Sequence, residues 1–301
     1  MTPSHPLISK IFQTHCIPLS ELESSSRGIY IHKPSEKMYF TKTQSDIPQM
    51  TGEIEGLKAM ARTTPGLGLV PEVIGFEVDE KQNQCAMVTQ YFKLGSSSRN
   101  IQRELGEGLA KMHSVPKDRE GYEGKFGFGV RTHCGATEQD NTYTESWEEF
   151  YRDRRLGDLV KRIGDDTISK EWERMKDRVI PLLLHEIDPP PQPVILHGDL
   201  WSGNKGYDTI TGKAVIYDPA SYYGHNEADL GITHMFGGFS KDFYDAYHAI
   251  HPKSQPHYDE RQKLYELYHH LNHTLMFGGS YKSGSLAIMR SLNDWAKDKE
   301  L

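Results

Sequence analysis

Cysteine is scarce in this sequence. Only three of the 301 residues are cysteines, namely Cys16, Cys85 and Cys134, and no two of them form a CxxC pair. A disulfide framework or a cysteine-based zinc site would need cysteines in closely spaced, even-numbered sets. We therefore predict neither, and we expect the chain to reside in a reducing compartment.

Long hydrophobic runs and an excess of positive charge are also missing. No stretch approaches the ~18 consecutive apolar residues that indicate a membrane-spanning helix, and residues 1–12 lack the basic and apolar segments of a secretory signal. The 35 basic residues are outnumbered by 42 acidic ones, which gives a net charge of −7. We therefore expect a cytoplasmic protein that binds neither membranes nor nucleic acid, because a net negative charge disfavours non-specific binding to both.

The sequence does have an ordinary globular composition, with 36% hydrophobic and 26% charged residues. Its length is sufficient for one large or two modest domains with hydrophobic cores. Residues 1–92 are predicted to form a small lobe with an antiparallel sheet, since short runs rich in β-branched and aromatic residues alternate with helical and polar segments. The expected elements are helices at 6–15 and 50–61 (capped by Thr51), a Ser-rich turn or loop at 20–28, and strands at 29–32, 37–43, 73–78 and 85–91.

The rest of the chain, residues 93–301, has mainly helical apolar spacing. The predicted helices are residues 101–113, 147–162, 171–184, 242–248, 261–277 and 284–297, and two strand-like runs interrupt them. We therefore predict an α+β protein with two lobes, of which the second is larger and mainly helical.

The most informative segment is residues 194–204, which reads VILHGDLWSGN. Its apolar, strand-like start leads into a turn that places Asp199 and Asn204 five positions apart. In the catalytic loop of protein kinases, an Asp accepts the proton of the substrate hydroxyl and an Asn five positions later holds magnesium. A His-Gly-Asp tripeptide alone is more often a simple turn, because Gly adopts unusual backbone angles and Asp caps its own loop.

A second carboxylate, Asp218, ends another apolar run at the place where the kinase pattern requires its main magnesium ligand. Two hard oxygen ligands, from Asn204 and Asp218, suit Mg2+, which keeps several water or phosphate oxygens as its other ligands. Asp199, Asn204 and Asp218 together therefore favour a phosphoryl-transfer site over a simple turn.

Phosphoryl transfer also requires a cation near the triphosphate and an acid that holds this cation in place. Lys42, at the end of a predicted strand, and Glu53, in the first turn of the next helix, supply such a pair, although exposed Lys and Glu side chains are more often simply solvated.

Two further segments are candidates for binding ATP. The backbone of Gln90, Tyr91 and Phe92, where the small lobe ends, either contacts the adenine ring or is an ordinary strand end. The segment ESSSRG at residues 23–28 would cover the phosphates with Ser25, Ser26 and Gly28, with added charge from Arg27, but it contains a single glycine.

The chain closely resembles the fructosamine-3-kinase and ketosamine-3-kinase family, within the aminoglycoside phosphotransferase and choline kinase-like group. The likeness rests on LHGDLWSGN at residues 196–204 and YDPASYYGH at residues 217–225. Further family landmarks are KFGF at 125–128, Trp147 with Phe150, Arg155-Leu156, MFGGF at 235–239, AYH at 246–248, LNH at 271–273 and Phe277-Gly278. The resemblance runs from about residue 28 to residue 292.

This resemblance implies a bilobal protein-kinase-like fold, ATP and Mg2+ as cofactors, and ketosamines or glycated proteins as partners. In such enzymes ATP phosphorylates the 3-hydroxyl of a ketosamine, and the unstable product releases the amine, which repairs glycated protein. The implied roles are Asp199 as proton acceptor, Asn204 and Asp218 as magnesium ligands, Lys42 and Glu53 as the phosphate-positioning pair, and residues 90–92 as the adenine-contacting strand.

Three features depart from the family pattern. The phosphate loop is Ser-rich where relatives are often Gly-rich, and it lacks the cysteine that some relatives carry there, so we expect no redox switch in this loop. Tyr143 stands where family members commonly have tryptophan. These departures concern nucleotide affinity and substrate preference more than the type of reaction.

Several residues near the catalytic motif are candidates for choosing the substrate or for bracing the loop. Trp201 offers an indole platform for the C–H face of a sugar, or lies in the core under the loop. His225 and Glu227 either line the pocket or brace the loop. Bracing is expected of His197 and Asp229, since a carboxylate that accepts backbone N–H bonds can hold the catalytic turn.

Histidine is abundant, with fifteen residues. His269 and His273 can share one face of a helix, but no acidic partner at metalloprotease spacing accompanies them, and we predict no zinc site there.

Two other functions stay open from the sequence. The acceptor could be an aminoglycoside, a choline-like amine or another hydroxyl metabolite. Alternatively, the Ser-rich loop could belong to a catalytically weak, kinase-like binding module.

Overall fold

The computed structural model describes residues 5–26, 28–95, 100–117 and 121–299. Its N-terminal region is built on a five-stranded antiparallel sheet with the strand order β1-β2-β3-β5-β4. The elements of this region are α1 Pro6–Thr14, β1 Leu22–Ser26, β2 Ile29–His32, β3 Met38–Gln44, α2 Ile47–Thr63, β4 Val73–Asp79 and β5 Gln84–Gln90.

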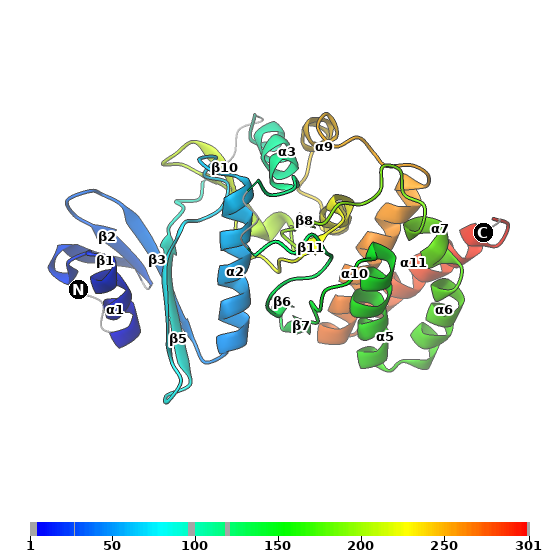
Figure 1. Ribbon diagram of the computed structural model, residues 1–301, viewed down its shortest axis with the longest axis horizontal. Coiled ribbons are helices and arrows are strands. Elements are labelled where there is room, and N and C mark those ends of the chain that lie inside the picture. Colours follow the sequence, from blue (N-terminus) through cyan, green and yellow to red (C-terminus); the bar gives the residue numbers. More distant parts are fainter. Residues whose placement is uncertain (1–4, 27, 96–99, 118–120, 300–301) are drawn as a thin grey trace.

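Helices α1 and α2 cover opposite faces of this sheet (Figure 1). Successive side chains of a strand point to opposite faces, and the central strand β5 illustrates the consequence. Ala86 and Val88 belong to a buried cluster with residues of α1, whereas Cys85 and Met87 form a second cluster with residues of α2. Because both faces are covered, β5 reads as a continuous apolar run and not as an alternating one.

The Ser-rich segment that we predicted to be a turn or loop instead forms strand β1. This strand pairs with β2 in an antiparallel register, from Leu22 opposite His32 to Ser26 opposite Ile29. Leu22 is buried in the cluster under α1. The prediction was wrong because serine has a low strand propensity by itself, whereas pairing with β2 satisfies the backbone of the segment.

Helix α2 begins at Ile47, three residues earlier than predicted. Its N-cap is Asp46, whose carboxylate accepts the backbone N–H of Gln49 at 2.9 Å. Thr51, the predicted cap, lies inside the helix and donates its hydroxyl to the carbonyl of Ile47 at 2.8 Å. Glu53 consequently lies in the second turn of the helix and not in the first.

The C-terminal region is mainly helical, as predicted. Its helices are α3 Asn100–Met112, α4 Trp147–Tyr151, α5 Asp158–Ile163, α6 Asp166–Lys176, α7 Val179–Leu184, α8 Gly231–Met235, α9 Lys241–His248, α10 Tyr258–Phe277 and α11 Ser280–Ala296. Three small antiparallel pairs join them: β6 Thr132–Cys134 with β7 Thr137–Gln139, β8 Val194–Ile195 with β11 Tyr223–Gly224, and β9 Lys205–Asp208 with β10 Lys213–Ile216.

Two of the predicted helices are interrupted. The helix predicted at 147–162 contains a π-helical turn, Arg152–Gly157, between α4 and α5. The helix predicted at 171–184 is divided into α6 and α7. Pro181 falls in the first turn of α7, where no backbone N–H is needed, so the break before Val179 accommodates this proline without loss of a helical hydrogen bond.

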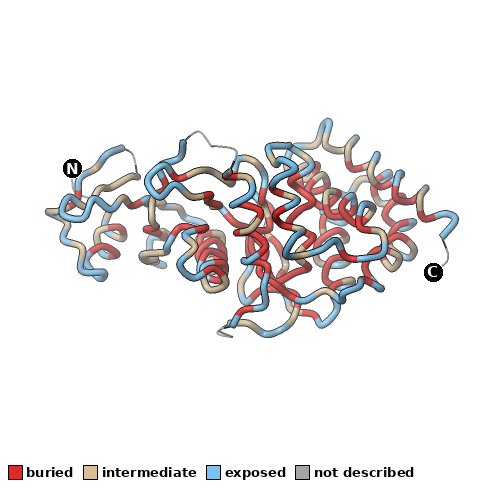
Figure 2. The backbone as a smooth tube through the Cα atoms, turned by 90° about the horizontal axis from the view of Figure 1, so that it is seen from above, coloured by how far each residue is buried: buried red, intermediate tan, exposed pale blue. Residues whose placement is uncertain are grey.

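Most of the buried backbone lies in the C-terminal region and in α2 (Figure 2). One large hydrophobic cluster contains the apolar side chains that flank the catalytic motif, including Ile195, Leu196 and Leu200, each 0% exposed. The strand pair β8 and β11 therefore anchors this motif in the main core of the protein.

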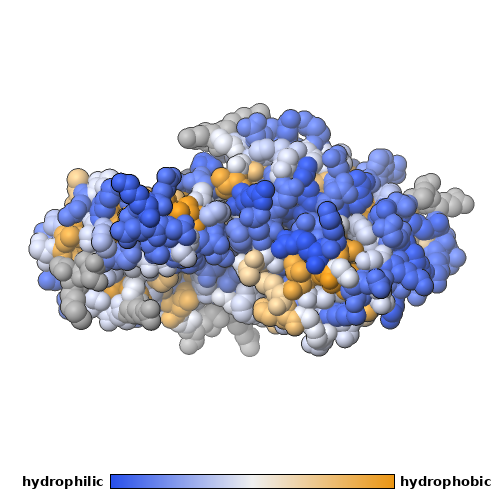
Figure 3. Space-filling model, turned by 90° about the horizontal axis from the view of Figure 1, so that it is seen from below, coloured by the Kyte–Doolittle hydropathy of each residue, from blue (hydrophilic) through white to orange (hydrophobic). Residues whose placement is uncertain are grey.

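Hydrophilic side chains cover most of the face shown in Figure 3, and hydrophobic ones gather there in small patches. Among the described residues, no helix is both long enough and apolar enough to cross a membrane.

Candidate active site

The turn that carries the predicted catalytic motif is fixed by a glycine and by a buried carboxylate. Gly198 has φ +81°, and a Cβ atom there would lie 2.1 Å from the carbonyl oxygen of Ala220. The two carboxylate oxygens of Asp229 accept the backbone N–H groups of His197 and Gly198, both at 2.7 Å. The turn after β8 is thus held by hydrogen bonds from its backbone to a buried side chain.

Asp229 itself is only 2% exposed. Its Oδ2 also lies 3.0 Å from Nε2 of His113 in the turn that follows α3. Burial alone would raise the pKa of Asp229, but the contact with His113, the nearby His197 and the N–H of Gly198 hold this pKa below its usual range. The carboxylate is therefore charged, and it orients the catalytic turn through fixed hydrogen bonds.

The imidazole of His197 connects the two predicted functional loops. Its Nε2 lies 2.9 Å from the carbonyl oxygen of Tyr217, next to Asp218, and its Nδ1 accepts the backbone N–H of Asp199 at 3.3 Å. These partners require a neutral ring with its proton on Nε2. Burial lowers the pKa of His197, in agreement with this neutral form.

Asp199, Asn204 and Asp218 come together at the ends of these two loops. The side-chain amide Nδ2 of Asn204 donates to the backbone carbonyl of Asp199 at 2.9 Å, to its carboxylate at 3.3 Å and to the carbonyl of Asp218 at 3.4 Å. Asp218 is exposed and has φ +56°, a left-handed conformation that is uncommon for aspartate.

The environment of Asp199 makes it a suitable proton acceptor. Burial raises the pKa of Asp199 to about 7, and the negative charges of Asp229 and Asp218 act in the same direction, while contacts with Cys134 and Asn204 oppose them. A carboxylate with a pKa near neutrality combines a useful basicity with a deprotonated population at physiological pH.

On the nucleotide side, Nζ of Lys42 lies 2.6 Å from Oε2 of Glu53. Strand β3 supplies the lysine and α2 supplies the acid. Burial raises the pKa of Glu53, although the positive charge of Lys42 opposes this effect. The sequence-predicted pair is therefore formed across the sheet–helix interface.

A cavity of about 230 Å³ lies next to this pair and extends to the proposed metal-binding loop. Its apolar walls come from the sheet, α2 and the segment after β5, and both Glu53 and Asp218 border it. The walls include Phe40, Leu57, Met87, Phe92 and Tyr217. A flat aromatic ring can be accommodated between such apolar walls.

The structure distinguishes the three residues of the predicted adenine-contacting strand. The N–H of Gln90 donates to the carbonyl of Glu72 at 2.8 Å, and that of Tyr91 donates to the carbonyl of Met38 at 3.0 Å. Both N–H groups are therefore engaged within the protein. Phe92 borders the cavity, and none of the described residues accepts a hydrogen bond from its backbone N–H.

The Ser-rich hairpin between β1 and β2 lies beside the strand that carries Lys42. The carbonyl of Gly28 accepts the backbone N–H of Thr41 at 2.7 Å and its hydroxyl at 3.1 Å. Ser25 and Ser26 are exposed at the tip of this hairpin. Arg27, to which the sequence assigned added charge, lies outside the described residues.

Trp201 lies at the surface of the catalytic turn, 38% exposed, and not in the core beneath it. Its indole lies over Gly203, where a Cβ atom would be 2.3 Å from the ring. The ring centroid of Trp201 is 5.7 Å from that of Phe236, which in turn is 5.5 Å from that of His273. A partly exposed row of three rings therefore begins at Trp201, two positions after Asp199.

His225 and Glu227 do not line this open side. Each is 1% exposed. Nδ1 of His225 lies 2.7 Å from the hydroxyl of Tyr265, and Glu227 pairs with Nε of Arg261 at 2.8 Å. Of the two alternatives given by the sequence, the structure favours bracing over contact with substrate, because both side chains are enclosed and already have partners.

Sequence reasoning missed several residues that contact the site. His113, Phe236 and Cys134 come from three segments distant in sequence from the HGD motif. Phe236 belongs to the family landmark at residues 235–239, but no role in the site was assigned to it, and His113 and Cys134 belong to no recognisable spacing. Only tertiary packing brings them to Asp229, Trp201 and Asp199. For His113 and Cys134 a single sequence therefore contains no signal that would have identified them, whereas the landmark at residues 235–239 could have drawn attention to Phe236.

Known proteins resemble this chain over most of its length. A sequence model of the fructosamine kinase family matches residues 22–294. A protein named "Protein-ribulosamine 3-kinase, chloroplastic" from Oryza sativa subsp. japonica is 39% identical over 264 residues, which cover 86% of this chain and 73% of that protein.

Solved structures share the fold. A crystal structure of a candidate fructosamine-3-kinase from Thermobifida fusca superimposes with a TM-score of 0.71 at 25% identity, and covers 90% of this chain and 92% of that one. A likeness of the fold alone, with a TM-score of 0.61 at 13% identity, relates 92% of the chain to 94% of the aminoglycoside phosphotransferase APH(4)-Ia, in a ternary complex with AMP-PNP and hygromycin B. The predicted kinase-like α+β fold is confirmed, and the chain belongs to the fructosamine kinase family.

Proposed function

We propose that this protein is an ATP-dependent phosphotransferase that phosphorylates the 3-hydroxyl of ketosamines, as amine adducts or on glycated protein lysines. One observation carries the proposal: in a member of the fructosamine kinase family, a half-buried Asp199 with a pKa near 7 contacts Asn204 and lies two positions before an exposed tryptophan. The rice relative is named a protein-ribulosamine 3-kinase, and ribulosamines and fructosamines are both ketosamines. Release of the amine from the phosphorylated product would make the activity one of protein repair.

In this proposal Asp199 orients the acceptor hydroxyl and accepts its proton as the oxygen attacks the γ-phosphorus of ATP. The bond between this phosphorus and the β,γ-bridging oxygen breaks, and ADP leaves. Asp229 and His197 act through Asp199, since they hold the backbone from which its side chain projects. Catalysis would come mainly from positioning and electrostatics.

Asn204 and Asp218 would hold Mg2+. Both donate hard oxygen ligands, and the surroundings fit: Nδ2 of Asn204 is engaged by Asp199 and Asp218, which leaves its Oδ1 as the metal-facing atom, and the Asp218 carboxylate is exposed beside the cavity. When bound, Mg2+ supplies positive charge against the phosphate oxygens.

The remaining ATP contacts would come from the N-terminal region. Lys42, oriented by Glu53, would contact phosphate oxygens, and the serines at the tip of the β1–β2 hairpin, Ser25 and Ser26, would cover them together with Gly28. The ring of the adenine would lie in the cavity between the sheet and Tyr217, with the backbone of residues 90–92 at its edge.

The acceptor would lie on the side of Trp201. An indole ring offers an apolar platform for the C–H face of a sugar and keeps its N–H as a donor. Phe236 and His273 continue this row of rings from Trp201, so the amine portion of the ketosamine would extend along them.

An acceptor panel with labelled ATP tests the proposal. Fructoselysine, ribuloselysine and a glycated protein would be compared with an aminoglycoside and with choline, and the products would be identified by mass spectrometry. Phosphorylation of a ketosamine at its 3-hydroxyl is expected. Transfer only to the aminoglycoside or to choline would replace the ketosamine by another acceptor, and failure to bind magnesium-ATP at millimolar concentration would indicate a binding module instead.

We also propose a cytoplasmic location for this activity, on the basis of the acidic composition and the three cysteines, none of which forms a disulfide. The rice relative carries the word "chloroplastic" in its name, so an organelle is the competing location. Cell fractionation with an antibody to the full chain separates the two.

A further inference from the structure

Three side chains with different donor atoms meet at the closed side of the catalytic base. Cys134 comes from β6, Asp199 from the turn after β8, and His269 from α10. The cysteine sulfur, a carboxylate oxygen and a histidine ring nitrogen all lie within 4.8 Å of one another. Among the described residues, this is the group of His, Cys, Asp and Glu side chains close enough to share a metal ion.

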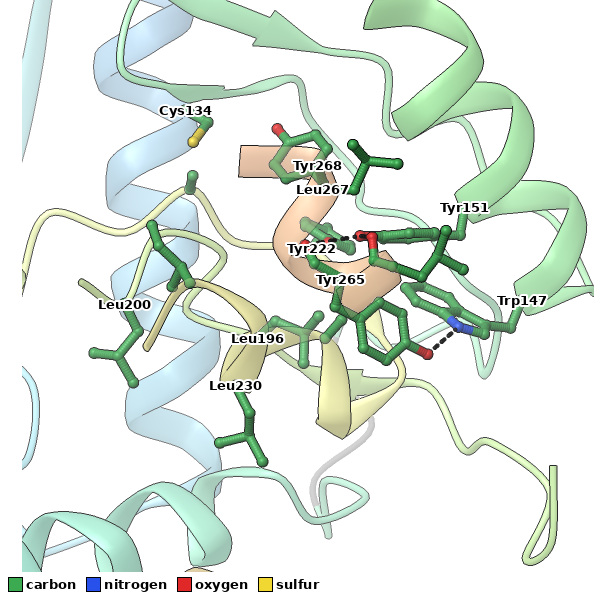
Figure 4. Packing of buried hydrophobic residues seen from close by; sticks show 14 of the residues in the cluster. Cys134, Trp147, Tyr151, Leu196, Leu200, Tyr222, Leu230, Tyr265, Leu267 and Tyr268 are labelled. Carbon is green, nitrogen blue, oxygen red and sulfur yellow. Dashed lines mark hydrogen bonds between the residues drawn. The ribbon is translucent and has the colours of Figure 1, made fainter. Parts of the chain in front are cut away.

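The cysteine and the histidine are enclosed by the core. Cys134 is 2% exposed and His269 is 3% exposed, while Asp199 is partly exposed. In Figure 4, Cys134 lies at the same end of the hydrophobic cluster as Tyr268, which is the chain neighbour of His269. Of the three side chains, that of Asp199 is therefore the most accessible to solvent.

An independent observation points to a missing ligand. Nδ1 of His269 is buried and has no hydrogen-bond partner among the residues that the structure describes, although buried polar atoms almost always have one. Burial also lowers the pKa of His269 to about 3, so the ring is neutral, which is the form that binds metals. A neutral, buried and incompletely satisfied imidazole next to a thiol is unusual for a residue that serves only packing.

We propose that Cys134, Asp199 and His269 form a binding site for a thiophilic divalent cation, Zn2+ in the first place. Thiolate and imidazole ligands select zinc over magnesium, which prefers oxygen. Binding would release the thiol proton to solvent, because a coordinating thiol is deprotonated. The fourth position would be open to water on the partly exposed side of Asp199.

The distances allow this site with modest rearrangement. Zinc–ligand bonds of about 2.0–2.3 Å place tetrahedral donor atoms roughly 3.3–3.8 Å apart. The three donor atoms lie up to 4.8 Å from one another in the structure, so they would have to move closer by about 1 Å to bind zinc.

The consequence for activity rests on the proposed function. A cation on Asp199 occupies the carboxylate that would accept the hydroxyl proton, so zinc would switch the kinase off. This inhibition would compete with the ketosamine and not with ATP, because Lys42, Asn204 and Asp218 are not used by the zinc ion.

Titration of the full chain with Co2+, a spectroscopic substitute for zinc, tests the site without any activity assay. One equivalent should produce a thiolate-to-cobalt charge-transfer band, which Zn2+ removes and excess Mg2+ leaves unchanged. Cys134→Ser should abolish the band, and His269→Gln should weaken cobalt binding by at least about tenfold. Cys85→Ser is the matched control, since Cys85 is also buried but lies in the sheet, and it should retain the band.

Absence of the band in the wild-type protein, or its persistence in Cys134→Ser with circular dichroism unchanged, would overturn the site. Zinc that binds but leaves ketosamine phosphorylation unchanged would overturn the proposed inhibition. The two proposals fail separately: a cobalt band without kinase activity on any acceptor refutes only the proposed function, whereas an active kinase without a band refutes only the zinc site.

Discussion

The two regions of this protein hold their parts of the site in different ways. In the N-terminal region, the nucleotide-side pair of Lys42 and Glu53 bridges β3 and α2, and the lysine side chain is about one-third exposed. In the C-terminal region, the catalytic turn is bonded to Asp229, which is enclosed and contacts His113. Changes to Asp229, the buried support of the catalytic turn, should therefore affect folding and turnover together, whereas changes to the Lys42–Glu53 pair should affect turnover alone.

The largest effect is expected from Asp199→Ala. Loss of the proposed base should lower kcat by about 10²- to 10⁴-fold, because general base catalysis contributes a factor of this size. Magnesium-ATP binding and the unfolding midpoint should stay close to those of the wild type, since Asp199 is only half-buried. Single-turnover assays, isothermal titration and thermal unfolding check the three quantities. Turnover close to that of the wild type would refute the role of Asp199.

Asp229→Ala tests whether the catalytic turn depends on its buried support as much as its contacts indicate. A small effect on stability would remove the difference between the two regions. The substitution leaves His113 and two backbone N–H groups without their acceptor, and breaking a buried charged network costs about 3–5 kcal/mol of unfolding free energy. Denaturant unfolding measures this cost. The conservative variant Asp229→Asn keeps one acceptor oxygen and should lose less, and an unfolding free energy equal to the wild type in Asp229→Ala would contradict the proposed bracing.

Lys42→Met should lower catalytic efficiency and leave stability nearly unchanged. Loss of a charged hydrogen-bond donor to phosphate oxygens should reduce kcat/KM by about 10- to 100-fold, in line with about 1.5–3 kcal/mol for such an interaction. Because the lysine side chain is partly solvated, the unfolding midpoint should change little. Steady-state kinetics at varied ATP, together with thermal unfolding, separates the two effects. Lys58→Met, on an exposed surface of α2, is the matched control.

Acid should act mainly on the C-terminal region. Burial lowers the pKa of His225 to about 4, so between this value and the unfolded pKa of about 6.5 the unfolded chain binds more protons than the folded one. The unfolding free energy should therefore fall as pH decreases from about 6.5, by at most about 1.4 kcal/mol per pH unit for this residue. In His225→Gln the amide can still contact the Tyr265 hydroxyl, but it does not titrate. The variant should therefore reduce the dependence of the unfolding free energy on pH, measured by denaturant unfolding between about pH 5 and pH 7. An unchanged slope would show that His225 is already protonated when folded.

Much of the fold could be predicted because local patterns and tertiary structure agree. The strands after residue 28 and most helices of the C-terminal region follow their apolar spacing, and the family model and the solved structures confirm the kinase-like architecture. The division of the chain after Phe92 stays a prediction. The errors occur where propensity and context disagree: β1 is a strand through pairing with β2, and the cap of α2 is Asp46 and not Thr51.

The candidate site could be predicted as far as its residues lie in motifs. The motif residues Asp199, Asn204 and Asp218 contact one another through the amide of Asn204, and Lys42 reaches Glu53. Their catalytic and binding roles stay predictions. Spacing could not tell whether Glu227 lines the pocket or braces the loop, because its burial against Arg261 depends on the packing of α10 against the turn before α8.

The same limit applies to the proposed zinc site. The sequence directed attention to His269 and His273, which are four positions apart on one helix, and no site was predicted from them. The structure instead groups His269 with a cysteine and an aspartate from two other segments. Metal sites assembled from distant segments carry no spacing signal, so they become visible only in three dimensions.

The ring of His197 joins the loop of the proposed base to the loop of the proposed metal ligands, because one nitrogen faces the N–H of Asp199 and the other faces the carbonyl of Tyr217. The two loops are consequently not free to evolve independently. A substitution that moves one shifts the optimum of the other, so paired changes in residues 197–204 and 217–218 should be non-additive. Attempts to change the acceptor of this protein will therefore be more successful if they redesign the surface around Trp201 and leave both loops, which His197 connects, unchanged.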